Sequence, residues 1–108
     1  MKYNLAKEFS TTPFGRDSND GKNSGERFRP ILIELLNTCK KNNEQLTIDL
    51  DDVPIGIGSS FLDEGFAGVV RCKAFTEKQF HKLTIIKSID VSYIEEINEY
   101  VNDAENGR

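Results

Sequence analysis

The stretch Ile55–Val70, IGIGSSFLDEGFAGVV, decides the fold of this 108-residue chain. It follows Leu46–Leu50, whose pattern predicts a strand, and its Gly and Ser residues predict a bend that leads into a helix. Ser59 or Ser60 is expected to cap this helix, because serine oxygens bind the free N–H groups of a first turn. Ser60 and Asp63 also have the spacing of a capping box.

Two glycines make this predicted helix thin. Gly65 and Gly68 lie within it, and a glycine costs about 1 kcal/mol in a helix interior. The cost is acceptable where another element must approach closely, so we expect this helix to pack tightly against a sheet or a partner. Asp63 and Glu64 lie in its first turn, where the helix dipole favours negative charge.

Strand and helix patterns alternate along the rest of the chain. Strands are predicted at Met1–Phe9, Leu46–Leu50 and Leu83–Ile86, and helices at Glu26–Lys41, from Ser59 or Ser60 to Val70, and after Asp90 or Ser92, with a short helical turn at Thr76–Phe80. This order predicts an α/β fold, a mostly parallel or mixed sheet of about four strands packed with helices. The length fits a single domain spanning residues 1–108.

Composition narrows the function classes. With 14 Lys and Arg against 18 Asp and Glu, the net charge of -4 argues against general nucleic-acid binding, which depends on neutralising phosphates. The basic stretch Arg71–Lys87 is accordingly expected to be a solvated face. Cys39 and Cys72 are expected to be buried thiols, and the single His81 completes no common zinc set, so neither metal nor cofactor is predicted. No signal peptide or membrane span is visible, which predicts a cytoplasmic location.

The segment Ser10–Gly25 is a long loop rich in Gly, Asn, Asp and Ser. Arg16 lies in it, and Arg27 and Arg29 follow it. These arginines indicate either a solvated loop or an anion-binding pocket. The sequence GKNSGE within this region lacks the order and spacing of a Walker A loop.

Three short segments together carry a family resemblance: FSTTPFGR at Phe9–Arg16, DGKNSGERFR at Asp20–Arg29 and SSFLDE at Ser59–Glu64. The chain resembles the STAS-like family of unknown function found in bacteria and phages. The strand LTIDLDDV and the following SSFLDEGFAGVVR are also similar to the STAS domains of anti-sigma-factor antagonists. The resemblance covers the chain from about Phe9 to Arg71.

The resemblance implies a regulatory protein-interaction module. In anti-sigma-factor antagonists, a histidine-kinase-like ATPase phosphorylates the first serine of the corresponding turn and thereby releases the domain. That position is Ser59 here, followed by Ser60, with Gly58 where the antagonists have Asp and Phe61 where they have Gly. Such an ATPase, or another regulator, is expected to bind the segment Ser59–Val70. The expected partner-binding residues are Phe61, Leu62, Asp63, Glu64 and Gly65, with an exposed and partly apolar surface around Phe61 and Gly65.

Two other interpretations remain open from the residues. In the first, the chain is a nucleotide- or phosphate-binding subunit or enzyme, in which arginines hold phosphate and carboxylates hold a metal or act as base. The residues concerned are Arg16, Arg27 and Arg29, with Glu26, Asp63 or Glu64. No nucleophile–base pair is apparent, which favours binding over catalysis. In the second, Glu26, Arg27 and Arg29 form internal ion pairs that lock the first loop onto the Ser59–Glu64 turn.

Overall fold

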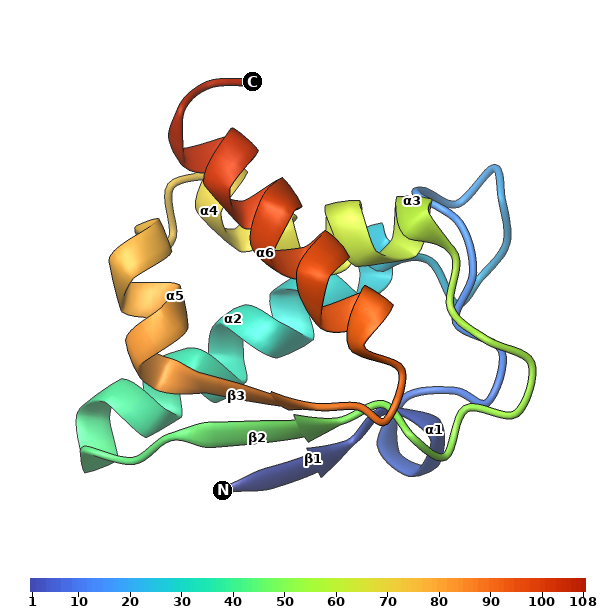
Figure 1. Cartoon of the computed structure of the whole chain (residues 1–108), viewed down its shortest axis with the longest axis horizontal. Helices are drawn as coiled ribbons and strands as arrows, with labels where there is room; N and C mark the ends of the chain where they lie inside the picture. The colour runs from blue at the N-terminus through green and yellow to red at the C-terminus, as the bar shows by residue number, and fades with distance from the viewer.

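The computed structural model describes residues 1–108. Its sheet has three parallel strands in the order β1 (Lys2–Asn4), β2 (Leu46–Asp49) and β3 (Thr84–Lys87), so the strand count is slightly below the predicted four (Figure 1). The central strand fixes the register, because Ile48 of β2 pairs with Tyr3 on one side and with Ile86 on the other. The predicted α/β class is confirmed.

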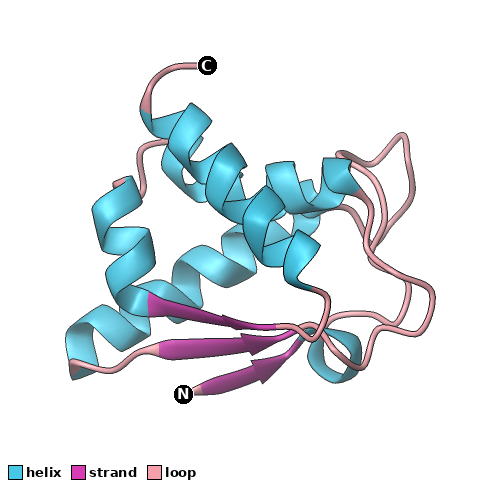
Figure 2. Ribbon diagram, viewed as in Figure 1, coloured by secondary structure: helices cyan, strands magenta, loops and turns pink.

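The helices occupy the connections between and after the strands (Figure 2). They are α1 (Leu5–Glu8), α2 (Gly25–Asn42), α5 (Glu77–Leu83), α6 (Val91–Glu105) and one continuous helical segment composed of α3 (Ser59–Leu62), the π-helical turn η1 (Asp63–Ala67) and α4 (Gly68–Arg71). None of them is long and apolar enough to cross a membrane.

The N-terminal strand is shorter than predicted. The pattern at Met1–Phe9 indicated one strand, but β1 ends at Asn4 and a helical turn follows. The cause is local: the Asn4 side chain accepts a hydrogen bond from the backbone N–H of Lys7 at 3.0 Å and so caps α1. Glu8 in turn accepts the backbone N–H of Asn4 at 2.7 Å.

The sheet is covered on one face only. Alternation along the strands places Tyr3, Leu46, Ile48 and Thr84 on the buried face, while Lys2, Ile85 and Lys87 are exposed on the other. The core comprises 22 buried residues from the buried sheet face and the helices. In Figure 1, α4 and α6 lie above the strands and α2 passes behind β3.

Glycines bring α2 and the α3–η1–α4 segment into contact. A Cβ atom on Gly25 would lie 2.8 Å from the backbone nitrogen of Gly65 and 2.9 Å from the carbonyl oxygen of Phe61. A Cβ on Gly68 would lie 2.9 Å from Cδ of Arg29. The close approach predicted from the glycines is therefore confirmed, but the predicted neighbour was wrong: it is the helix α2 rather than a sheet or a partner.

The two cysteines differ in exposure. Cys39 is buried, as predicted, whereas Cys72 is exposed. The prediction was wrong for Cys72 because the helical segment ends at Arg71, and Lys73 has a left-handed backbone that turns the chain toward solvent. The predicted short turn at Thr76–Phe80 is the longer helix α5, which Thr76 and Gln79 begin with a capping box.

Candidate functional site

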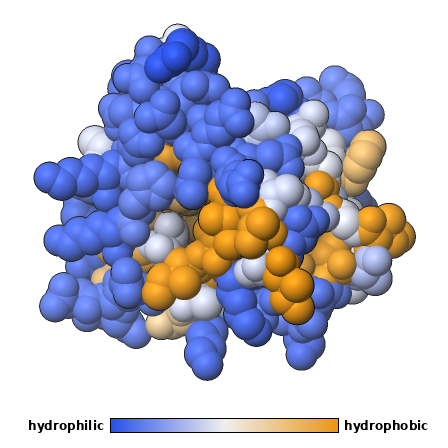
Figure 3. Space-filling view, viewed as in Figure 1, coloured by the Kyte–Doolittle hydropathy of each residue, from blue (hydrophilic) through white to orange (hydrophobic).

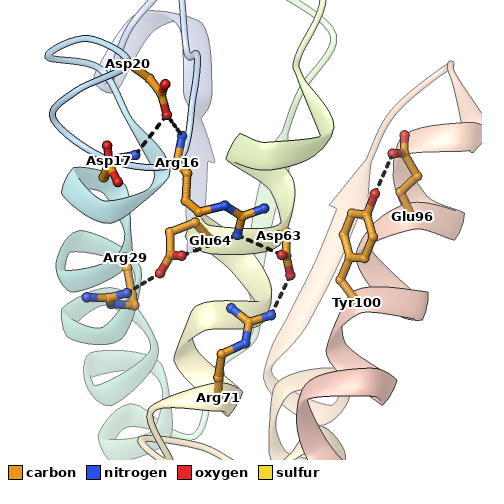
Figure 4. Close-up of polar contacts among 9 residues, drawn as sticks. All are labelled: Arg16, Asp17, Asp20, Arg29, Asp63, Glu64, Arg71, Glu96 and Tyr100. Atoms are coloured by element: carbon orange, nitrogen blue, oxygen red, sulfur yellow. Dashed lines mark hydrogen bonds and ion pairs between the residues drawn. The ribbon is translucent and has the colours of Figure 1, made fainter. Parts of the chain in front are cut away.

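The start of α3 is attached to α6 by its first serine. Ser59 Oγ donates to Glu96 Oε1 at 2.5 Å, and the hydroxyl of Tyr100 donates to the same oxygen at 3.1 Å; Figure 4 shows the second contact. Ser59 and Ser60 are both exposed. The helix cap is Gly58, which makes no side-chain hydrogen bond. The prediction that a serine caps this helix is therefore wrong, because the Glu96 carboxylate takes the Ser59 hydroxyl.

A second contact with α6 holds the bend before Ser59. The backbone N–H of Ile57 donates to the hydroxyl of Tyr93 at 3.0 Å. We call the contacts of Ile57 and Ser59 with Tyr93, Glu96 and Tyr100 the α6 clasp. The clasp joins residues that are 36 or 37 positions apart in the chain.

Asp63 and Glu64 lie about one turn further along the helix, where three arginines bind them (Figure 4). Arg16 Nη1 lies 2.8 Å from Asp63 Oδ2 and 3.5 Å from Glu64 Oε1. Arg71 Nη2 binds Asp63 Oδ1 at 2.5 Å, and Arg29 Nη1 binds Glu64 Oε2. We call these five residues the arginine brace. It ties the loop before α2, α2 itself and the end of α4 to η1.

The brace is partly shielded from solvent. The Asp63 and Glu64 side chains are 20% and 18% exposed, and Arg16 is 44% exposed. The hydrogen bond to Asp63 raises the Arg16 pKa above its ordinary value, although burial acts against this shift. Three positive and two negative groups meet here, so the brace carries one net positive charge.

The N-terminus of α2 offers no binding site for an anion. Its first N–H groups are bound by the preceding loop: Gly25 donates to the Gly15 carbonyl and Glu26 to the Arg16 carbonyl, each at 2.9 Å. The Ser24 side chain accepts the N–H of Arg27 at 3.3 Å. The loop therefore satisfies this helix end internally.

The three arginines predicted to bind an anion do not converge. Arg16 and Arg29 meet at Glu64, but the Arg27 guanidinium lies 5.1 Å from the Phe9 ring centroid and donates to Asn23 at 3.0 Å. Glu26 is exposed, with no ion pair to these arginines. The internal ion-pair interpretation thus applies to Arg29, and it is wrong for Glu26 and Arg27.

Arg71 is a brace residue that sequence reasoning missed. It was assigned to a solvated face as part of the basic stretch Arg71–Lys87, and it lies eight positions after Asp63. In a regular α-helix, two side chains that are eight positions apart point in directions that differ by about 80° around the helix axis, so they do not share a face. The π-helical turn η1 contains an additional residue, so the eight positions span about two turns and Arg71 reaches Asp63. Only the helix type reveals this contact.

The expected apolar surface around Phe61 and Gly65 is not present. Phe61 and Leu62 are fully buried, and Gly65 is buried against α2, so that prediction is wrong. Asp63 and Glu64 keep partial exposure. Gly65 lies beside Gly25 and the ring of Phe28, and the Phe61 ring packs against the ring of Phe28.

The three most exposed large apolar side chains lie instead on the connections that follow the strands. Phe14 follows β1, Ile55 follows β2 and Ile89 follows β3, with exposed fractions of 62%, 82% and 88%. We call these three residues the loop rim. Figure 3 shows apolar groups interrupting the hydrophilic surface toward the centre and right of this face.

Comparison with known proteins identifies the family. Residues 24–93 match the family model described as a STAS-like domain of unknown function. The chain therefore belongs to this family, which confirms the resemblance found in its sequence motifs. The match includes Ser59, Asp63 and Glu64, whereas Arg16 and Glu96 lie outside it. No curated protein and no solved structure matches the chain.

Proposed function

We propose that this STAS-like domain is a regulatory protein-interaction module that phosphorylation of Ser59 switches. One observation carries the proposal: the exposed Ser59 hydroxyl begins a helix at the surface and is bound there by a single side chain, Glu96. The proposed partner is a histidine-kinase-like ATPase, the class implied by the similarity to anti-sigma-factor antagonists.

The loop rim supports the proposal of a protein interface. A single exposed hydrophobic residue is ordinary in a folded protein. Here three large ones, Phe14, Ile55 and Ile89, lie on the three connections that follow the strands. Apolar anchors of this kind carry much of the binding energy of protein interfaces. In the proposal they contact the partner, while Ser59 determines whether contact is possible.

The proposed switch is a change of charge. The kinase transfers the γ-phosphoryl group of a nucleoside triphosphate to Ser59 Oγ: the O–H bond breaks, an O–P bond forms, the proton passes to solvent and the diphosphate leaves. The product carries about 1.5 to 2 negative charges at neutral pH. A partner surface fitted to the neutral hydroxyl then loses affinity through desolvation and repulsion.

The test is capture of partners from cells that naturally produce the protein, with ADP or ATP present, followed by phosphosite mapping. We expect a histidine-kinase-like ATPase on the wild type, phosphate on Ser59 with ATP, and at least tenfold less capture by Ser59→Asp. Ile55→Ser with Ile89→Ser should lose the partner, and Ser60→Asp is the matched control. An ATPase without phosphate removes the covalent switch. Absence of any such ATPase, with Ser59→Asp unchanged, overturns the proposal.

A further inference from the structure

We propose that Arg16 is the receptor for a phosphoryl group on Ser59, so that phosphorylation transfers the start of α3 from α6 to the loop before α2. This inference rests on the proposed function and describes how its switch is registered inside the domain. Three features of the structure support it: the position of Arg16, its unused hydrogen-bond donors and the charges that surround Ser59.

The first feature is the position of Arg16 relative to Ser59. The backbone N–H of Asp63 donates to the Ser59 carbonyl, so the two residues are separated by one α-helical turn. Side chains at this spacing share a face, with Cβ atoms about 5–6 Å apart. Arg16 Nη1 is already 2.8 Å from Asp63 Oδ2. The guanidinium therefore lies within reach of a phosphoryl group that extends from Ser59 Oγ.

The second feature is that Arg16 has unused hydrogen-bond donors. Both of its ion pairs use Nη1, and its other guanidinium nitrogens bind no protein group. An arginine has five N–H donors in a planar fork, which suits two parallel bonds to phosphate oxygens. The side chain is 44% exposed, so this free edge is open to solvent. Arg16 is positioned to bind phosphate while it keeps its contact with Asp63.

The surrounding charges set the direction of the change. Glu96 and Tyr100 face Ser59 from α6, and Asp63 faces it from its own helix. In the unmodified chain, Ser59 Oγ donates its proton to Glu96 Oε1 in a hydrogen bond of 2.5 Å. A phosphoserine has no such proton at neutral pH, so this contact becomes a repulsion between two anions. Arg16 offers the nearby positive charge, whereas Arg71 lies at the end of α4, beyond η1 from Ser59.

This transfer links the modified serine to the loop rim. Phe14 lies two residues before Arg16 and is 62% exposed. The loop is fixed around Arg16 by Asp20, whose carboxylate accepts the Arg16 backbone N–H at 2.9 Å. A phosphoryl group bound by the Arg16 side chain is thereby attached to the loop that also carries Phe14. In the inference, a charge placed on Ser59 thus acts on the loop that presents an apolar contact to the partner.

The test uses the full chain with phosphoserine incorporated at position 59 during translation, and it needs neither kinase nor partner. The second phosphate pKa, ordinarily about 6, is measured by ³¹P NMR titration. We expect it to lie at least about 0.5 unit below that of a chain with phosphoserine at position 60, because Arg16 stabilises the dianion. Arg16→Gln should abolish the difference, and Arg16→Lys should retain part of it.

Arg71→Gln is the matched control, because it also removes an ion pair to Asp63 but leaves Arg16 in place. It should keep the lowered phosphate pKa. Hydrogen exchange should become slower in the loop before α2 and faster in the first turns of α6. A phosphate pKa that is unaffected by Arg16→Gln, or equally affected by Arg71→Gln, overturns the inference. Since the phosphoserine is installed directly, these results are independent of whether an ATPase is found in cells.

Discussion

The helical segment that runs from Ser59 to Arg71 is held at two places, and the two attachments are of different kinds. At the arginine brace, partly buried ion pairs lie beside a glycine interface where backbones nearly touch. At the α6 clasp, hydroxyl groups meet a carboxylate near the surface. Charged hydrogen bonds away from solvent contribute about 1.5–3 kcal/mol, and exposed polar contacts about 0–1 kcal/mol. The clasp is therefore the attachment that a modification can open without unfolding the domain.

The largest effect should come from filling the glycine interface. In Gly25→Ala, the added Cβ would lie 2.8 Å from the Gly65 backbone nitrogen, so α2 and η1 must separate. We expect a loss of about 2 kcal/mol in the free energy of unfolding, measured in urea. Gly58→Ala is the control, since a Cβ there meets nothing within 4 Å. Equal stability of the two variants would contradict the close packing described above.

Next in size is the loss of a brace carboxylate. Glu64→Gln removes the charge that binds Arg16 and Arg29, and we expect it to cost about 1–2 kcal/mol of unfolding free energy. A double-mutant cycle with Arg29→Gln should show coupling, the double variant losing less than the sum. Glu95→Gln, on the exposed face of α6, should change stability by less than about 0.5 kcal/mol. Strict additivity in the cycle would mean that the brace does not act as a unit.

Opening the α6 clasp should lower the free energy of unfolding by less than the loss of a brace carboxylate. Ser59→Ala removes the donor to Glu96, and we expect at most about 1 kcal/mol of destabilisation, because the contact is exposed. Hydrogen exchange should increase locally at the start of α6. Ser60→Ala, whose side chain is exposed and makes no hydrogen bond in the structure, is the matched control. A loss as large as that of Glu64→Gln would remove the distinction between brace and clasp.

The smallest effect concerns acid stability at the open sheet face. The backbone N–H of Asp51 and then the ammonium group of Lys87 lower the pKa of Asp49 below 3.8. A lowered pKa in the folded state gives stability that is complete above the unfolded pKa and lost as the pH falls through the folded value. Asp49→Asn should thus flatten the decline of stability below about pH 4. An unchanged acid profile would show that this exposed pair contributes nothing.

Local patterns predicted much of this protein. The helix predicted at Glu26–Lys41 is α2, whose side chains Phe28, Leu32, Leu36 and Cys39 recur at helical spacing and are buried, and Asp90 caps α6. The glycines of the segment after Ser59 indicated close packing, although they did not indicate that a helix would be the neighbour. These predictions succeeded because each depends on residues within a few positions of one another, where backbone geometry sets the spacing.

The errors also have a common cause. The serines were expected to cap a helix, since capping is a local interaction. The Ser59 hydroxyl instead binds Glu96, which lies 37 residues away in the chain. The surface expected at Phe61 is buried for a similar reason, because Phe28 and Phe9 pack against its ring. A local rule identifies what a side chain can bind but not which distant group reaches it first.

The amino-acid order alone therefore specified the α/β alternation, the helix faces and the family motifs, since these follow from the repeats of helix and strand. The tertiary structure decided which charges meet. Arg16 binds residues 47 and 48 positions away, and Arg71 reaches Asp63 only because a π-helical turn intervenes. Such contacts depend on how whole elements are placed against one another, and that placement comes from the packing of the complete core rather than from any single stretch.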